Sequence, residues 1–170
     1  MKAYELAEAE IGTVEWKDGN NPKVVAYFRD AGHPQVKDDE TAWCAAFVGA
    51  MLHRAGLPKT GKLTARSYLD WGVKVDRAMA KPGDIVILKR GTSSWQGHVG
   101  FFVRDNGTSI TILGGNQNNA VNRRAYKVDG GQLLGIRRLK AEAEAQPAPA
   151  PTPKVSWLTA LLLAIFGRKS

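Results

Sequence analysis

Hydrophobic residues recur with a helical period in the first third of the chain. Over residues 43–51 they fall at i, i+3, i+4, i+7 and i+8, which is the spacing of one buried helix face, and Gly56 ends the run. Residues 1–10 also have helical character, and Asn21 followed by Pro22 is typical of the start of another helix. The pattern therefore predicts three helices in this part of the chain.

The second half of the chain has the short hydrophobic runs of β-strands. Two neighbouring runs are separated by Asp105-Asn106-Gly107, a turn that favours a hairpin. Helices followed by strands predict an α+β fold, with N-terminal helices packed on an antiparallel sheet of about five strands. The predicted strands cover residues 84–89, 98–104, 109–114, 120–127 and 133–139.

The length of 170 residues suits one globular core and a tail. We expect one domain over residues 1–140, an Ala/Pro-rich linker over 141–154, and a short apolar segment with a basic end over 155–170. The apolar part would form a helix of about 18 Å, shorter than the roughly 30 Å hydrocarbon core of a bilayer. We therefore expect this segment to contact a membrane or envelope surface, with docking on the domain as the alternative.

The formal net charge of +8 favours partners that are anionic. Cell-envelope polymers and lipid head groups would attract such a protein. Nucleic acid is the competing partner, but the sequence has no recognised nucleic-acid-binding motif, so we do not expect the protein to bind nucleic acid. The positive charge could also serve solubility alone. The N-terminus lacks the pattern of a secretory signal peptide, and the single cysteine suits a reducing compartment.

The single cysteine lies at the start of a predicted helix. With Thr41 as the N-cap, Cys44 falls in the first turn, where unpaired backbone N–H groups and the helix dipole favour a thiolate. A lone cysteine is often only a small buried hydrophobic residue, and Cys44 by itself leaves that alternative open. A nucleophilic cysteine would also need an imidazole base and a third polar group from other parts of the fold.

Among the three histidines, His98 is the best candidate for the base. His53 follows Cys44 by nine residues on the same predicted helix and faces the opposite side, and His33 lies in a turn. His98 instead opens a predicted strand. If that strand forms a hairpin with the next, Asn116 returns beside His98 and its side-chain oxygen can accept the second imidazole N–H. The chain order Cys, His, Asn is that of a papain-like site.

Four short motifs follow one another along the chain: TAWCAAF at 41–47, PGDIV at 82–86, GHVGF at 97–101 and GGNQ at 114–117. In this order they resemble the CHAP family of cysteine, histidine-dependent amidohydrolases/peptidases, and in particular its compact phage and prophage branch. The resemblance covers about residues 1–140. Many members of the family have a glutamate two residues before the asparagine, where this chain has Gly114.

The resemblance implies a papain-like α+β fold and hydrolysis of amide bonds in peptidoglycan. Position by position, it implies that Cys44 is the nucleophile, His98 the base and Asn116 the residue that orients the base. No metal or organic cofactor is expected.

Further residues are candidates for a substrate groove, because sugars and peptides suit aromatic faces flanked by hydrogen-bond donors. Three of them lie on a short predicted helix over residues 65–72, although core packing explains Trp71 equally well. The candidates are Trp43, Arg66, Tyr68, Trp71, Trp95 and Gln117.

Three acidic residues, Asp38, Asp39 and Glu40, directly precede the cysteine helix. Their simplest role is to complement the helix dipole. A cation site is the alternative, but calcium needs further oxygen ligands at set spacing that this stretch does not offer. No metal site is therefore predicted.

These features together predict a peptidoglycan hydrolase, specifically a phage or prophage endolysin that is monomeric. We expect it to stay in the host cytoplasm before lysis and then to act on the bacterial cell wall. Two alternatives remain: a papain-like amidase that acts on soluble peptides, and a non-catalytic envelope-binding or virion-structural module.

Overall fold

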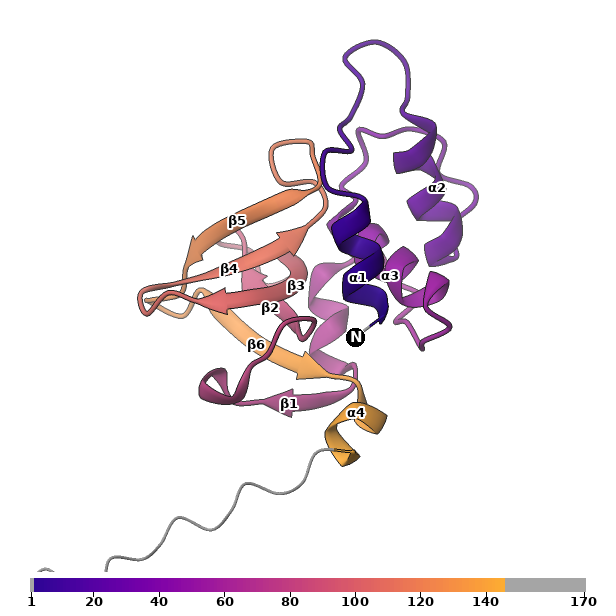
Figure 1. Cartoon of the computed structure of the whole chain (residues 1–170). Coiled ribbons are helices and arrows are strands. Elements are labelled where there is room, and N and C mark those ends of the chain that lie inside the picture. The colour runs from indigo at the N-terminus through magenta and orange to yellow at the C-terminus, as the bar shows by residue number, and fades with distance from the viewer. Residues whose placement is uncertain (1, 146–170) are drawn as a thin grey trace, which may run out of the picture.

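The computed structural model describes residues 2–145, whose three longest helices gather on one side of an antiparallel sheet (Figure 1). The helices are α1 (Lys2–Ala9), α2 (Pro22–Ala31), α3 (Cys44–Arg54), the 3-10 helices η1 (Ala65–Asp70) and η2 (Arg77–Met79), and α4 (Lys140–Glu144). The strands are β1 (Val73–Val75), β2 (Ile85–Lys89), β3 (Gly97–Asp105), β4 (Ser109–Gly114), β5 (Asn122–Lys127) and β6 (Leu133–Arg138). The predicted α+β class is confirmed.

The sheet has the strand order β1-β6-β2-β3-β4-β5, with every pair antiparallel. Strands β2 to β5 form a meander, and β6 returns to lie between β1 and β2. The predicted β3–β4 hairpin is present, with Asp105 opposite Ile110. The prediction of about five strands missed β1, because three residues are too few to give a clear alternating pattern.

Helices α2 and α3 begin in different ways. As predicted, the Asn21 side chain caps α2 by accepting the Lys23 backbone N–H at 2.9 Å, and Pro22 is the first helical residue. Thr41, however, is not the N-cap of α3. Its backbone N–H donates to the Asp38 carboxylate at 2.7 Å in a preceding turn, and α3 begins only at Cys44.

The sheet separates two hydrophobic clusters. On β2, Ile85 and Ile87 pack under the helices, while Val86 and Leu88 face the other side, as the two-residue period of a strand requires. The helix side holds the larger cluster, in which Trp43 stacks on the Tyr27 ring at a centroid distance of 5.8 Å. The rings of Tyr4 on α1 and Phe47 on α3 meet the Phe101 ring of β3 edge to face, at centroid distances of 6.3 and 6.5 Å, so aromatic packing also holds these helices against the sheet.

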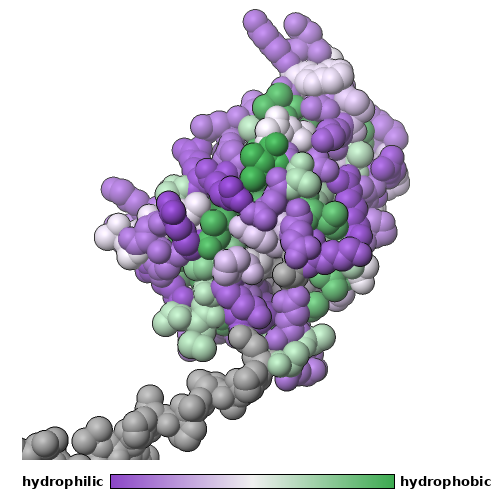
Figure 2. Space-filling view, in the orientation of Figure 1, coloured by the Kyte–Doolittle hydropathy of each residue, from purple (hydrophilic) through white to green (hydrophobic). Residues whose placement is uncertain are grey.

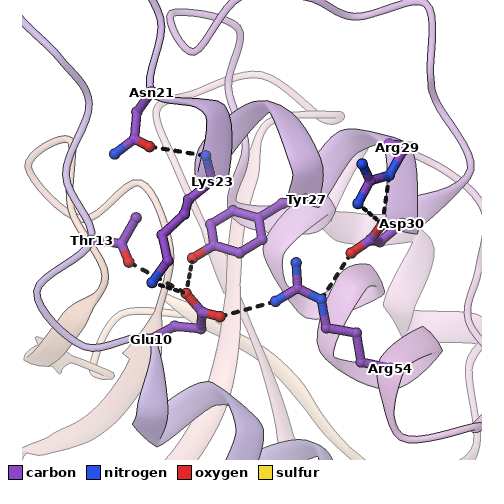
Figure 3. Close-up of polar contacts among 8 residues, drawn as sticks. All are labelled: Glu10, Thr13, Asn21, Lys23, Tyr27, Arg29, Asp30 and Arg54. Atoms are coloured by element: carbon purple, nitrogen blue, oxygen red, sulfur yellow. Dashed lines mark hydrogen bonds and ion pairs between the residues drawn. The ribbon is translucent and has the colours of Figure 1, made fainter.

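A polar cluster joins the end of α1 to α2 and α3 (Figure 3). Glu10 accepts hydrogen bonds from the Tyr27 hydroxyl at 2.7 Å and from Arg54 at 3.0 Å, and it pairs with Lys23 at 3.2 Å. Arg54 also bonds Asp30 at 2.8 Å. Burial acts to raise the Glu10 pKa, but the bonds from Tyr27 and Lys23 outweigh it, so the pKa is lowered.

Hydrophilic residues cover most of the face shown in Figure 2, with hydrophobic residues in small separate patches. No helix within residues 2–145 is long and apolar enough to cross a membrane. Part of the predicted linker forms α4, and the segment 155–170 lies outside the described residues. Its expected contact with a membrane or envelope therefore stays a prediction.

Candidate active site

Cys44 is the first residue of α3 and is 6% exposed. Burial raises the pKa of its thiol, while the backbone N–H groups of Val99 and Ala45 point at the sulfur and act in the opposite direction. The contact with the Val99 backbone places the thiol beside β3, the strand that also carries His98. The resting thiol is therefore protonated at neutral pH.

His98 is the second residue of β3 and is 4% exposed. Its ring packs against the Tyr126 ring at a centroid distance of 5.3 Å. Burial lowers the His98 pKa to about 4, Gln117 opposes this through a hydrogen bond, and the positive charges of Arg90 and Arg124 lower the pKa further. The imidazole is therefore neutral at pH 7 and able to accept a proton.

The hydrogen bonds of Gln117 determine which nitrogen of His98 carries the proton. The Gln117 amide nitrogen lies 3.3 Å from the Gly114 carbonyl, 2.5 Å from the Asn122 carbonyl and 3.1 Å from the Asn122 side-chain oxygen, all of which are acceptors. The amide oxygen must then be the atom that faces His98 Nε2, at 3.2 Å. It follows that Nε2 donates; among the described residues no hydrogen bond engages Nδ1, which leaves that nitrogen able to accept a proton.

The hydrogen bond that orients His98 comes from Gln117 and not from Asn116, contrary to the sequence-based assignment. Asn116 lines the same cavity as His98, but it lies in a left-handed turn with a φ of 55° that directs the chain so that the next side chain reaches the ring. Gly114 makes room for this arrangement, since a Cβ there would lie 3.3 Å from the Gln117 amide carbon. This chain thus has Gly114 where many CHAP members have a glutamate, and the polar group beside His98 is the amide of Gln117.

Two cavities flank the site, and Arg90 lines both. One, of about 210 Å³, opens on Cys44, and the other, of about 200 Å³, opens on His98. Among the described residues no hydrogen bond joins the thiol to the imidazole, an arrangement that is common in enzymes without bound substrate. A substrate bound across both cavities would meet the thiol on one side and the imidazole on the other.

Several residues predicted to bind substrate lie in the core instead. The Trp43 side chain is fully buried and its indole N–H donates to Glu15, and Tyr68 is fully buried with its hydroxyl bonded to the Ala45 carbonyl. Trp71 is 7% exposed and donates to the Pro58 carbonyl. Large aromatic residues in predicted helices can either pack in the core or contact a substrate, so the sequence pattern alone does not distinguish the two roles.

The other predicted substrate-binding residues have different positions. Arg66 donates to the backbone carbonyls of Gln96 at 2.7 Å and Ser93 at 3.1 Å, so it holds the loop between β2 and β3. Trp95, on that loop, is 66% exposed and lines the Cys44 cavity, as expected of a substrate-contacting residue. Gln117 is 1% exposed and contacts His98, so it positions the base.

The acidic stretch before α3 serves the fold. Asp39 is fully buried and one carboxylate oxygen accepts the backbone N–H groups of Trp16 at 3.0 Å and Asn21 at 2.9 Å. It therefore ties the loop before α2 to the start of α3. In the part of the chain that the structure describes, no group of three or more His, Cys, Asp or Glu side chains could hold a metal ion.

The structure also brings in residues that sequence reasoning missed. Arg124 and Tyr126 lie on β5 and line the His98 cavity together with Arg90. The two-residue period of the strand places Arg124 and Tyr126 on one face, opposite Ile112 and Ile110 of β4. That alternation was visible in the sequence, but the strand register that brings it beside His98 was not.

The fold is that of a papain-like α+β protein, and it places a cysteine at a helix start and a histidine on the adjoining strand. Residues 36–116 match the family model described as CHAP domain. This segment is therefore similar to a CHAP domain, the family that the sequence motifs resemble. The matched segment includes Cys44, His98 and Asn116 and ends one residue before Gln117.

One of the similar solved structures shows the same fold at low identity, and two others align with lower scores. The wild-type endolysin LysIME-EF1 aligns at 15% identity and a TM-score of 0.52, over 84% of this chain and 64% of that one. The Mycobacterium tuberculosis peptidoglycan hydrolase RipB (15%, 0.47) and an NLP/P60-family lipoprotein-like protein from Staphylococcus aureus subsp. aureus Mu50 (14%, 0.47) each align over 81% of this chain. The alignments span 63% and 40% of those two chains. A comparison with curated protein sequences found no match.

Proposed function

We propose that this protein is a peptidoglycan hydrolase that cleaves an amide bond through a Cys44 nucleophile. The observation that carries the proposal is the position of Cys44, at the first residue of α3 and against the backbone of β3, the strand that holds a neutral His98 with Nε2 bonded to Gln117 and Nδ1 left for the thiol proton. The CHAP-domain match supports a cysteine-dependent amidase or peptidase. The net charge of +8 suits an anionic polymeric substrate.

The proposed reaction begins with a neutral pair. Because the thiol pKa is raised and the imidazole pKa is lowered, His98 Nδ1 takes the proton as the Cys44 sulfur attacks the amide carbonyl. The Cys44 backbone N–H at the start of α3 stabilises the oxyanion. His98 then gives its proton to the leaving amine, the C–N bond breaks and a thioester remains, which a water activated by His98 hydrolyses.

We further propose that the protein works as an endolysin, held in the host cytoplasm until it reaches the bacterial wall. The likeness in fold to the endolysin LysIME-EF1 is compatible with this role, although at 15% identity it supports the fold alone. The proposed substrate is the peptide stem, the cross-bridge or the glycan-to-peptide link of murein.

The test is the loss of turbidity of purified murein sacculi with the wild-type protein and with Cys44→Ala, followed by mass spectrometry of the soluble fragments. We expect clearing by the wild type alone, with the fragments distinguishing an amidase from an endopeptidase. Circular dichroism of both proteins provides the folding control. If the folded, reduced wild type clears no sacculi but cleaves soluble peptides, the papain-like peptidase is the better account; if it cleaves neither, a binding module is.

A further inference from the structure

The cavity beside His98 is strongly cationic. Its rim holds Lys89 and Arg90 at the end of β2 and Arg124 on β5, and its remaining lining is neutral. No acidic side chain is among the described residues that line it. A hollow of about 200 Å³ with three positive charges is a site for an anionic group on the order of a carboxylate.

These three cationic side chains differ from several other arginines of the protein in their lack of an ion pair within the described residues. Arg54, Arg77 and Arg123 pair with carboxylates of the fold. Within residues 2–145, by contrast, no ion pair neutralises Lys89, Arg90 or Arg124. Their charge is therefore available to a ligand.

Arg124 is also held in place before any ligand binds. Its Nη1 donates to the Asn118 side-chain oxygen at 2.6 Å, and its guanidinium lies 5.4 Å from the centre of the Tyr126 ring. A guanidinium fixed in this way loses less side-chain freedom on binding a carboxylate than a mobile one. Arg124 is consequently a preorganised anion receptor.

The cavity beside Cys44 has a different chemical character. Leu63, Ala65 and the exposed Trp95 line it, together with Ala42 and polar loop residues. Arg90 is the one residue shared by the two cavities, so an extended substrate would pass from the apolar side to the cationic side at Arg90. The two halves of a substrate are therefore expected to differ in charge.

The chemistry assigns each half of the substrate to one cavity. The acyl half becomes bonded to the Cys44 sulfur, and the amine half receives its proton from His98, so the amine half lies on the His98 side. Building on the proposed function, we infer that the His98 cavity binds a carboxylate carried by the amine-side fragment, with Arg124 and Arg90 as its receptors. The preferred substrate is thus an amide with an uncharged acyl residue and an acidic residue on the leaving side.

The first test compares sacculi with free carboxylates and sacculi whose carboxylates have been converted to amides with carbodiimide and ammonia. Amidation should lower the initial rate of fragment release by the wild type about tenfold or more. Arg124→Gln should lower the rate on free-carboxylate sacculi by about the same factor and should be insensitive to amidation. Lys127→Gln is the matched control, because it removes one exposed positive charge from the same strand outside the cavity and should behave as the wild type.

The second test measures binding without turnover. Isothermal titration calorimetry of Cys44→Ala with soluble murein stem peptides, acidic or fully amidated, should show about tenfold tighter binding of the acidic form. The double variant with Arg124→Gln should lose that difference.

The two tests separate the failure of the subsite from the failure of the proposed function. Sacculi cleaved equally with and without amidation, or an equal loss in Lys127→Gln and Arg124→Gln, would overturn the subsite while the hydrolase proposal stands. Sacculi left intact by the wild type, with the calorimetric preference for the acidic peptide retained in Cys44→Ala, would support the subsite and contradict the hydrolase.

Discussion

The surroundings of Cys44 and of His98 differ in the kind of contact that holds each side chain. Cys44 belongs to the large hydrophobic cluster on the helix side of the sheet, which also contains Trp43 and Phe47. His98 pairs with Leu88 across β2 and β3 and rests on Tyr126, next to the smaller cluster on the other face of the sheet. The thiol is thus held by apolar packing, and the imidazole by an amide that is itself anchored through hydrogen bonds.

One short loop, between β4 and β5, contacts the surroundings of both Cys44 and His98. Gly115 touches the cysteine side, since a Cβ there would lie 2.7 Å from Phe47 Cβ and closer still to the Trp43 ring. Gln117, two residues later, holds the histidine. The relative position of Cys44 and His98 therefore depends on the loop between β4 and β5. Each of the following changes disturbs one of these two residues or the loop that connects their surroundings.

Burial of neutral His98 should make folding stability depend on pH. The folded pKa of about 4 lies below the unfolded value of 6.5, so between these values the unfolded chain binds a proton that the folded chain does not. Stability should fall by about 3 kcal/mol as pH falls from 6.5 to 4, in addition to the effect of other groups, and should lose nothing more from His98 below that range. Urea unfolding at several pH values measures the loss.

His98→Gln is the control for this pH dependence. Its overall stability will differ, but its curve should lack the component that His98 supplies between pH 6.5 and 4. A His98 imidazole that titrates near 6.5 by NMR in the folded protein, identified by its absence from the His98→Gln spectrum, would contradict the buried, neutral base.

Gln117→Ala should lower turnover of sacculi about 100-fold, since an unoriented base is displaced from the reacting atoms. Asn116→Ala removes the neighbouring amide and should have a smaller effect, because Asn116 makes no hydrogen bond to His98 among the described residues. Initial rates of fragment release measure both. A larger loss in Asn116→Ala would return the orienting role to Asn116.

Gln117→Glu separates orientation of the base from simple structural support. A carboxylate beside Nε2 favours the protonated imidazole, so the acidic limb of the pH–rate profile should move to higher pH. A residue with only a structural role would leave that limb where it is in the wild type.

Gly115→Ala should cost about 2 kcal/mol of folding free energy, because a new methyl group would overlap rigid groups of Trp43 and Phe47. Gly114→Ala is the matched comparison, since its methyl group would meet the movable end of Gln117 at 3.3 Å. We expect it to lose less stability and proportionally more activity. Urea midpoints and sacculus assays distinguish the two; equal loss of stability would show that the loop does not depend on the contact with α3.

Much of this architecture could be predicted from periodicity and local capping. The helical spacing around Phe47, the Asn21–Pro22 start of α2, and the turn before Ser109 each act over a few residues, so the sequence predicts them well. Cys44 at a helix start and His98 at a strand start follow from the same local rules. The motifs that resemble the CHAP family lie on these elements.

The sequence by itself thus determined the α+β class, the hairpin, and the positions of Cys44 at a helix start and His98 at a strand start. Only the tertiary structure decided which amide reaches His98, because the turn at residues 116–119 and its bonds to Asn122 are set by contacts between strands. The burial of Trp43 and Tyr68, and the gathering of Arg90 and Arg124 at one cavity, were decided there as well. Spacing along the chain shows which side chains share a face, whereas packing between elements determines whether that face meets the core or the substrate.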